Sequence, residues 1–63
     1  MRIEVWKDDD GVVSAFTEGD PNKDIILGCD NNPVFVRYIE GEDWTDCMIQ
    51  HHRLMGWEEY KPF

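Results

Sequence analysis

The sequence predicts one α+β domain, in which a single α-helix packs on one face of a small, mostly antiparallel sheet. Three observations predict this fold. The chain has 63 residues, which is enough for one domain at most. Asp10-Gly11, a dipeptide typical of tight hairpin turns, separates two runs that are rich in β-formers. Apolar residues then recur with a helical period over residues 43–55.

The first two strands are expected at residues 2–7 and 12–17, joined as a β-hairpin. With the two-residue turn named above, Val5 lies opposite Phe16. The predicted core face of the hairpin then holds four apolar side chains: Ile3, Val5, Val12 and Phe16.

Residues 18–24 are expected to form a loop, because glycine, proline and asparagine punctuate them. Residues 25–27 are an apolar run too short to be assigned to a helix or a strand. Residues 34–40 predict the third strand. Strict alternation places three of its side chains on one face: Phe35, Arg37 and Ile39.

The predicted helix covers residues 43–55. Asp43 is the expected N-cap, and Asp46 adds a favourable negative charge in the first turn. Gly56 suits the left-handed conformation in which many helices end. The apolar face of this helix is predicted to hold six residues: Trp44, Cys47, Met48, His51, Leu54 and Met55.

Residues 57–61 are expected to form a last short strand, which Pro62 and Phe63 close. The third strand, the helix and this strand would then make a right-handed β-α-β crossover. With one helix available, the second face of the sheet is expected to be uncovered. Four side chains are predicted on it: Trp6, Val13, Ala15 and Tyr38.

The chain is acidic, with 14 Asp and Glu against 6 Lys and Arg and a formal net charge of −8. Nucleic acids and anionic membranes are bound through Lys and Arg, so neither is expected as a direct partner. A protein with a basic surface is expected instead. No stretch resembles a signal peptide or approaches the ~18 apolar residues of a membrane span. We therefore expect a cytoplasmic protein with reduced cysteines.

Cys47 and His51 lie one helical turn apart, a spacing that suits either a metal site shared with Cys29 or a nucleophile–base pair. No CxxC or HxxxH motif accompanies them, and no acidic loop matches the calcium-binding pattern. The simpler interpretation places Cys47 and His51 in the core between the helix and the sheet. We therefore expect no catalytic residue, no metal and no cofactor. If a metal is bound, its candidate ligands are Cys29, Cys47 and His51, with His52 as a possible fourth.

Acidic residues also gather at the hairpin tip and at the start of the helix, where they could meet a basic partner. The predicted partner-binding site consists of six residues: Trp6, Asp8, Asp9, Asp10, Glu42 and Asp43. If the acids converge, their surface could imitate the charge of a nucleic-acid backbone. If they are spread over several faces, they serve solubility alone.

The stretch from VFVRYIEGEDW to HHRLMGWEEYKP, about half of the chain, resembles the ends of short bacterial and phage proteins. In size, charge and element order the chain is also similar to small acidic phage proteins that inhibit host machinery, such as bacterial RNA polymerase. This resemblance implies a regulator or inhibitor and assigns no residue a role.

We expect a non-enzymatic protein that binds and regulates a larger protein. One form of this function is an inhibitor, made by a phage or mobile element, of a host protein that handles nucleic acids or acts in defence. Two alternatives stay open. The chain could be a structural module that forms a homodimer through a free strand edge or the uncovered sheet face. It could also be a small metal-binding protein that uses Cys29, Cys47 and His51.

Overall fold

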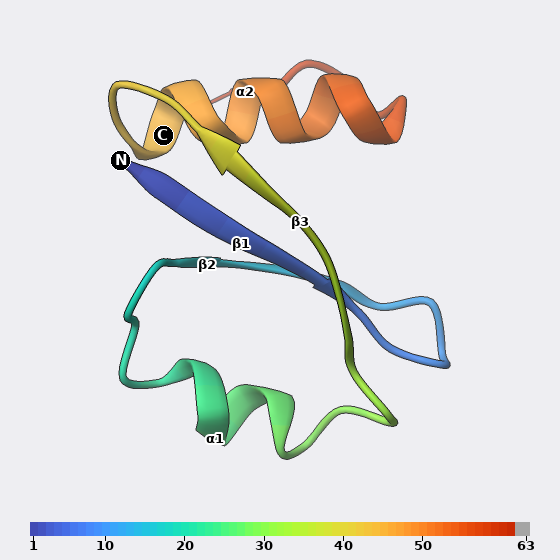
Figure 1. The fold of residues 1–63 in the computed structure, drawn as a ribbon. Helices are drawn as coiled ribbons and strands as arrows, with labels where there is room; N and C mark the ends of the chain where they lie inside the picture. The colour runs from blue at the N-terminus through green and yellow to red at the C-terminus, as the bar shows by residue number, and fades with distance from the viewer. Residues whose placement is uncertain (62–63) are drawn as a thin grey trace.

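A computed structural model describes residues 1–61 of the chain. Three strands form one antiparallel sheet in the order β2-β1-β3: β1 (Arg2–Lys7), β2 (Val13–Thr17) and β3 (Val34–Glu40). The longer helix α2 (Trp44–Met55) crosses one face of the sheet, and the short helix α1 (Lys23–Leu27) lies on the other (Figure 1). The fold is α+β, as the sequence predicts.

The core lies between the sheet and α2. Ile3 and Val5 of β1, Ile39 of β3 and Cys47 of α2 form its buried centre. Side chains of β1 alternate between the two faces, so Ile3 and Val5 both point toward α2. Partly buried apolar side chains complete this core: Val13, Ala15, Trp44 and Met48.

The register of the hairpin differs by one residue from the prediction. Val5 pairs with Ala15 rather than with Phe16. Because side chains alternate along a strand, a shift of one residue moves every side chain to the opposite face. Phe16 is therefore buried on the α1 face instead of joining Val5 in the core.

Asp8 is the physical reason for the shifted register. Its Oδ1 atom accepts hydrogen bonds from the backbone N–H of Asp10 at 3.0 Å and of Val12 at 2.9 Å. The loop therefore has three residues between the paired Asp8 and Val12, with Gly11 in the left-handed conformation at φ 83°. Val12, predicted in the core, is 51% exposed.

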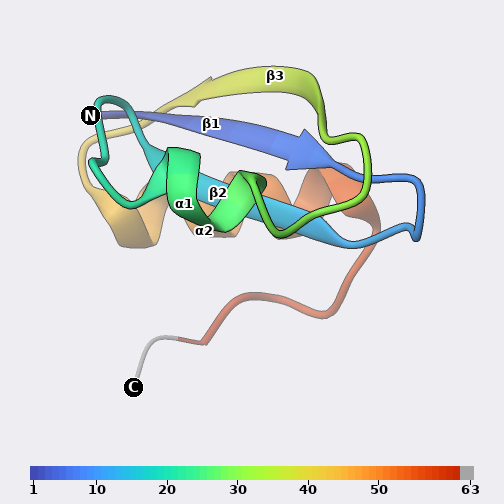
Figure 2. The same cartoon turned by 90° about the horizontal axis from the view of Figure 1, so that it is seen from below.

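The second face of the sheet is not bare, contrary to the expectation from the sequence. The apolar run that the sequence left unassigned is the end of α1, which lies across this face (Figures 1 and 2). Beneath α1, Glu4 of β1 is 7% exposed and accepts two hydrogen bonds from Lys23 Nζ at 3.1 and 3.3 Å. The cover is partial, because Ile25 and Ile26 of α1 stay exposed. Four side chains were expected on a bare face. Trp6 and Tyr38 lie on the α1 face, whereas Val13 and Ala15 pack against the core on the α2 face.

A β-bulge interrupts β3. Arg37 pairs with Val5, but the next pair joins Phe35 to Trp6, so Val36 is the extra residue. The bulge turns Phe35 to the α1 face, where its ring contacts that of Trp6 at a centroid distance of 5.6 Å. The predicted common face of Phe35 and Arg37 is therefore wrong.

The helix α2 confirms the predicted caps. The Asp43 side chain accepts a hydrogen bond from the Asp46 N–H at 2.8 Å, and Gly56 is left-handed at φ 72°. Asp46 in turn accepts from the N–H of Glu42 at 3.0 Å, which ties the entry of the chain to the first helical turn. Leu54, predicted on the apolar face, is 59% exposed.

Residues 57–61 form no strand, so the predicted β-α-β crossover is wrong. This segment packs on the end of α2 instead. The rings of Trp57 and Tyr60 lie 5.2 and 5.3 Å from the ring of His52, and His52 Nδ1 donates a hydrogen bond to the Glu58 carbonyl at 2.9 Å. Pro62 and Phe63, expected to close the strand, lie outside the described residues.

Candidate functional site

An exposed apolar strip runs along β3. Its members are Val34, Phe35, Val36 and Tyr38, whose exposed fractions are 62%, 40%, 41% and 51%. We call these four residues the β3 strip. β3 is an edge strand, and Figure 2 shows it along one margin of the molecule with both helices toward the other strands. Exposed apolar groups on neighbouring residues are characteristic of surfaces that contact other macromolecules.

Aromatic contacts hold one side of the β3 strip in place. The ring of Phe35 lies 4.8 Å from that of Tyr38 and makes a T-shaped contact with the ring of Trp6 at 5.6 Å. The guanidinium carbon of Arg2 lies 4.3 Å from the centre of the Tyr38 ring, a cation–π contact. Arg2 also forms an ion pair with Glu18, which raises the pKa of its guanidinium. The strip therefore presents an ordered aromatic surface.

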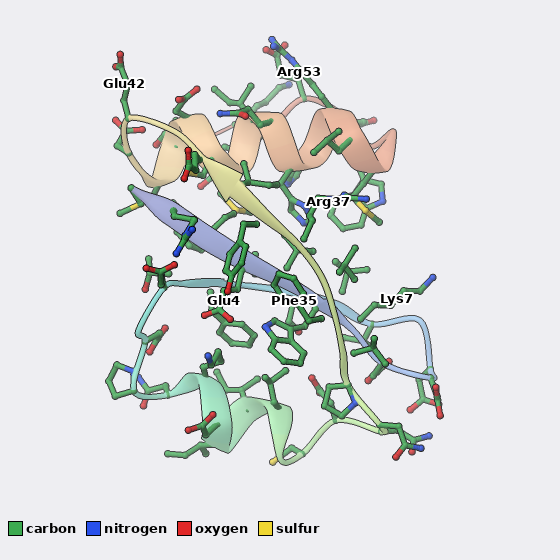
Figure 3. The ribbon with its side chains drawn as sticks, in the orientation of Figure 1. Glu4, Lys7, Phe35, Arg37, Glu42 and Arg53 are labelled. Atoms are coloured by element: carbon green, nitrogen blue, oxygen red, sulfur yellow. The ribbon has the colours of Figure 1, made fainter. Side chains whose placement is uncertain are left out.

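Acidic residues stand at both ends of the β3 strip. Glu40 ends β3, and the exposed Glu42 follows it (Figure 3). At the other end the hairpin tip approaches the start of β3, where the Asp9 N–H donates to the Asn31 carbonyl at 2.8 Å. Asp9 Oδ2 also accepts from the Asn32 side chain at 3.0 Å. The exposed apolar centre is thus flanked by negative charge at its two ends.

The structure divides the six predicted partner-binding residues into two groups. The hairpin tip lies at one end of β1, and residues 42 and 43 lie beyond the other end. Six residues of a strand span about 20 Å, so the two groups are separated by about that distance. Asp8 is 8% exposed and Asp43 caps α2, so both carboxylates serve the fold. Among residues 1–61, Asp10 and Glu42 are the two predicted acids whose carboxylates accept no hydrogen bond.

The sixth predicted residue, Trp6, is half-buried against Phe35 and lies next to the β3 strip. Val34 and Val36 were not predicted as site residues, because the sequence pattern does not show which strand lies at the edge of the sheet. The signal that could have found them is the number of strands. A chain this short forms few strands, so an apolar strand is easily left at an edge.

The candidate metal residues do not meet. Cys29 is exposed in the loop after α1, whereas Cys47 and His51 belong to α2 on the other side of the sheet (Figure 1). Within residues 1–61, no group of three or more His, Cys, Asp or Glu side chains is placed to hold a metal ion.

Cys47 and His51 also lack the geometry of a nucleophile–base pair. The Cys47 thiol lies 3.8 Å from the carbonyl oxygens of Met1 and Ile39, to which it can donate, and burial raises the pKa of this thiol. His51 is 2% exposed, and burial, with His52 and Arg37 nearby, lowers its pKa. Both groups are therefore favoured in their neutral forms inside the core.

No protein-family model, curated protein or solved structure matches this chain. The part of the chain that the structure describes shows no pocket. Its helices are all too short and too polar to cross a membrane. The candidate site is the β3 strip together with the acids at its ends.

Proposed function

We propose that this chain is a cytoplasmic, acidic, non-enzymatic binding protein that regulates a larger protein by occupying a basic surface on it. The observation that carries the proposal is the β3 strip, an exposed apolar and aromatic centre with carboxylates at both ends. Protein interfaces commonly have this composition, with aromatic anchors at the centre and charged residues at the rim. Occupation of the partner's surface would inhibit whatever that surface binds.

The charge distribution supports a basic partner. With a formal net charge of −8 on 63 residues, long-range attraction would speed the encounter with a positively charged surface. Tyr38 and Phe35 then supply apolar contact area, while Glu42 and Asp10 pair with cations at the rim. Because rim charges act mainly on the association rate, binding should weaken as salt is added.

Affinity capture from cell lysate followed by mass spectrometry tests the proposal. The wild-type chain is compared with a Glu40→Lys/Glu42→Lys variant, which reverses the charge at one end of the β3 strip. Neither carboxylate accepts a hydrogen bond among the described residues, so the fold should be kept. A matched control, Asp24→Lys/Glu58→Lys, makes the same change in net charge at exposed positions on α1 and after α2.

We expect the wild type and the control to capture the same basic protein, and the strip variant to lose it. If all three chains capture the same proteins in equal amounts, acids beside β3 have no role in recognition and the proposal is wrong. Circular dichroism of each variant checks that the fold is intact.

A further inference from the structure

Glu4 is a buried carboxylate with aromatic neighbours. On the central strand β1 it pairs with Phe16 of β2 and with Tyr38 of β3, and residues that pair across strands point to the same face of a sheet. Trp6, two residues further along β1, lies on that face as well. Figure 3 shows Glu4 on the side of the sheet that faces α1. A carboxylate that is 7% exposed therefore has aromatic side chains as neighbours in three directions.

This environment favours a cation, and one is bound there. Lys23 of α1 donates hydrogen bonds to both carboxylate oxygens of Glu4, at 3.1 and 3.3 Å. The hydrogen bond to Glu4 raises the pKa of the Lys23 ammonium, which is therefore charged at neutral pH. A buried carboxylate needs such a partner, and the faces of aromatic rings attract cations as well. A second cation on this face, Arg2, lies over the Tyr38 ring at 4.3 Å.

The element that supplies Lys23 is weakly held. α1 has five residues, none of them buried, and a helix this short has little stability of its own because nucleation is costly. Ile25 and Ile26 are 69% and 44% exposed, so they add little packing against the sheet. Among residues 1–61, the pair of Lys23 with Glu4 is the only hydrogen bond between a side chain of α1 and the sheet. Lys23 can therefore leave Glu4 while the core on the α2 side stays intact.

We propose that Glu4 and the aromatic rings around it form a binding site for a lysine side chain, which Lys23 occupies in the free chain and a lysine of the basic partner takes over in the complex. The exchange conserves the ion pair, since one ammonium group replaces another on the same carboxylate. Movement of α1 away from the sheet also uncovers Phe16 and Trp6, which adds apolar contact area beside the β3 strip. The identity of the second lysine rests on the proposed function, whereas the site itself does not.

Truncation of Lys23 opens the site to a small probe. Lys23→Ala removes three methylene groups and the ammonium, which are the heavy atoms of n-propylammonium, and alanine keeps the helix propensity of α1. At about pH 8 the amine is charged and the carboxylate is ionised. NMR titration of the Glu4 carboxyl carbon measures binding. We expect a dissociation constant of about 1–20 mM for Lys23→Ala, and binding at least roughly ten-fold weaker for the wild type, in which the probe competes with a tethered lysine.

Two variants serve as matched controls. Lys23→Ala/Glu4→Gln keeps the shape of the site without its charge and should not bind propylammonium. Arg53→Ala makes the same change in net charge as Lys23→Ala, by removing a cation from an exposed pair with Glu59. In about 50 mM propylammonium chloride, compared with sodium chloride at the same concentration, the melting temperature of Lys23→Ala should rise by at least about 3 °C and that of Arg53→Ala should not change. The melting temperature reports binding even where Lys23→Ala is only partly folded without the probe.

A peptide tests whether a lysine of another chain can enter the site. Acetyl-Gly-Lys-Gly-amide should bind Lys23→Ala with an affinity within about three-fold of that of propylammonium, and the same peptide with norleucine in place of lysine should not bind. If Lys23→Ala binds neither amine, or if the Glu4→Gln form binds them equally well, Glu4 is not a lysine site and the proposal is overturned. If propylammonium binds and the peptide does not, the exchange with a partner's lysine is wrong. These measurements need no cellular partner, so the site and the proposed function can fail separately.

Discussion

Replacement of Asp8 separates a structural carboxylate from a binding one. Asp8 is 8% exposed, and its Oδ1 atom accepts hydrogen bonds from the N–H groups of Asp10 and Val12. Asp8→Ala leaves both N–H groups without their acceptor and frees the hairpin loop to adopt other turns. The three-residue loop that sets the strand register is therefore expected to lose its main support.

The magnitude follows from these two bonds. A hydrogen bond to a charged group contributes about 1.5–3 kcal/mol, and two bonds to one oxygen are not additive. We therefore expect Asp8→Ala to lower the free energy of unfolding by about 2–3 kcal/mol. At about 4–8 °C per kcal/mol for a domain of this size, the melting temperature should fall by roughly 10–20 °C. Asp8→Asn keeps a neutral acceptor oxygen and should lose about half as much.

Thermal unfolding, followed by circular dichroism and by tryptophan fluorescence, measures these differences. The control is Asp10→Ala, since the Asp10 carboxylate is exposed and accepts no hydrogen bond within residues 1–61. It should change the free energy of unfolding by less than about 0.5 kcal/mol. If Asp8→Ala melts at the same temperature as Asp10→Ala, the carboxylate of Asp8 does not hold the loop and our account of the register is wrong.

Three further predictions concern the core. Burial lowers the pKa of His51 below its usual 6.5, so the unfolded chain takes up this proton first as the pH falls. The free energy of unfolding should then decrease below about pH 6.5 by up to about 1.4 kcal/mol per pH unit. Urea denaturation at a series of pH values measures this slope, and His51→Gln should flatten it. An unchanged slope in the variant would contradict the prediction. A Cβ atom on Gly41 would lie 2.6 Å from Asp46 Oδ2. Gly41→Ala should therefore lower the free energy of unfolding, measured by urea denaturation, by about 1–3 kcal/mol. An unchanged free energy of unfolding would show that the Asp46 side chain moves away at no cost. Ile3→Val removes a fully buried methylene and should cost about 1 kcal/mol, whereas Ile25→Val, at 69% exposure, should have no measurable effect on the melting temperature.

The longer helix was predictable because its signals are local. Asp43 and Gly56 each act within one turn of the residues that they cap, and the apolar spacing between them repeats over three turns. These features depend on the backbone of a single segment. The positions of β1 and β3 were predictable for the same reason, since each is a short run of β-formers between turn residues.

The register of the strands was not predictable from these patterns. Asp10-Gly11 fits a two-residue turn as well as a three-residue loop, and the Asp8 carboxylate decides between them. The bulge at Val36 likewise depends on how Phe35 packs on Trp6 across two strands. Each shift of one residue changes the face of every side chain beyond it.

Two further segments could not be assigned from the sequence pattern. Residues 25–27 have neither the length nor the period to predict a helix, and α1 is held in place by the contact of Lys23 with Glu4 of β1. Residues 57–61 have a strand-like composition, but Trp57 and Tyr60 pack against His52 on α2. In both segments a contact with a neighbouring element overrides local preference.

The sequence by itself determined the acidity, the capped helix and the positions of three strands, because composition and short-range patterns are properties of a linear chain. Only the tertiary structure decided which strand lies at an edge and which faces Phe35 and Phe16 occupy. These outcomes depend on how the strands pair and on how side chains of different elements pack together. The exposed β3 strip, on which the proposed function depends, arises from that arrangement.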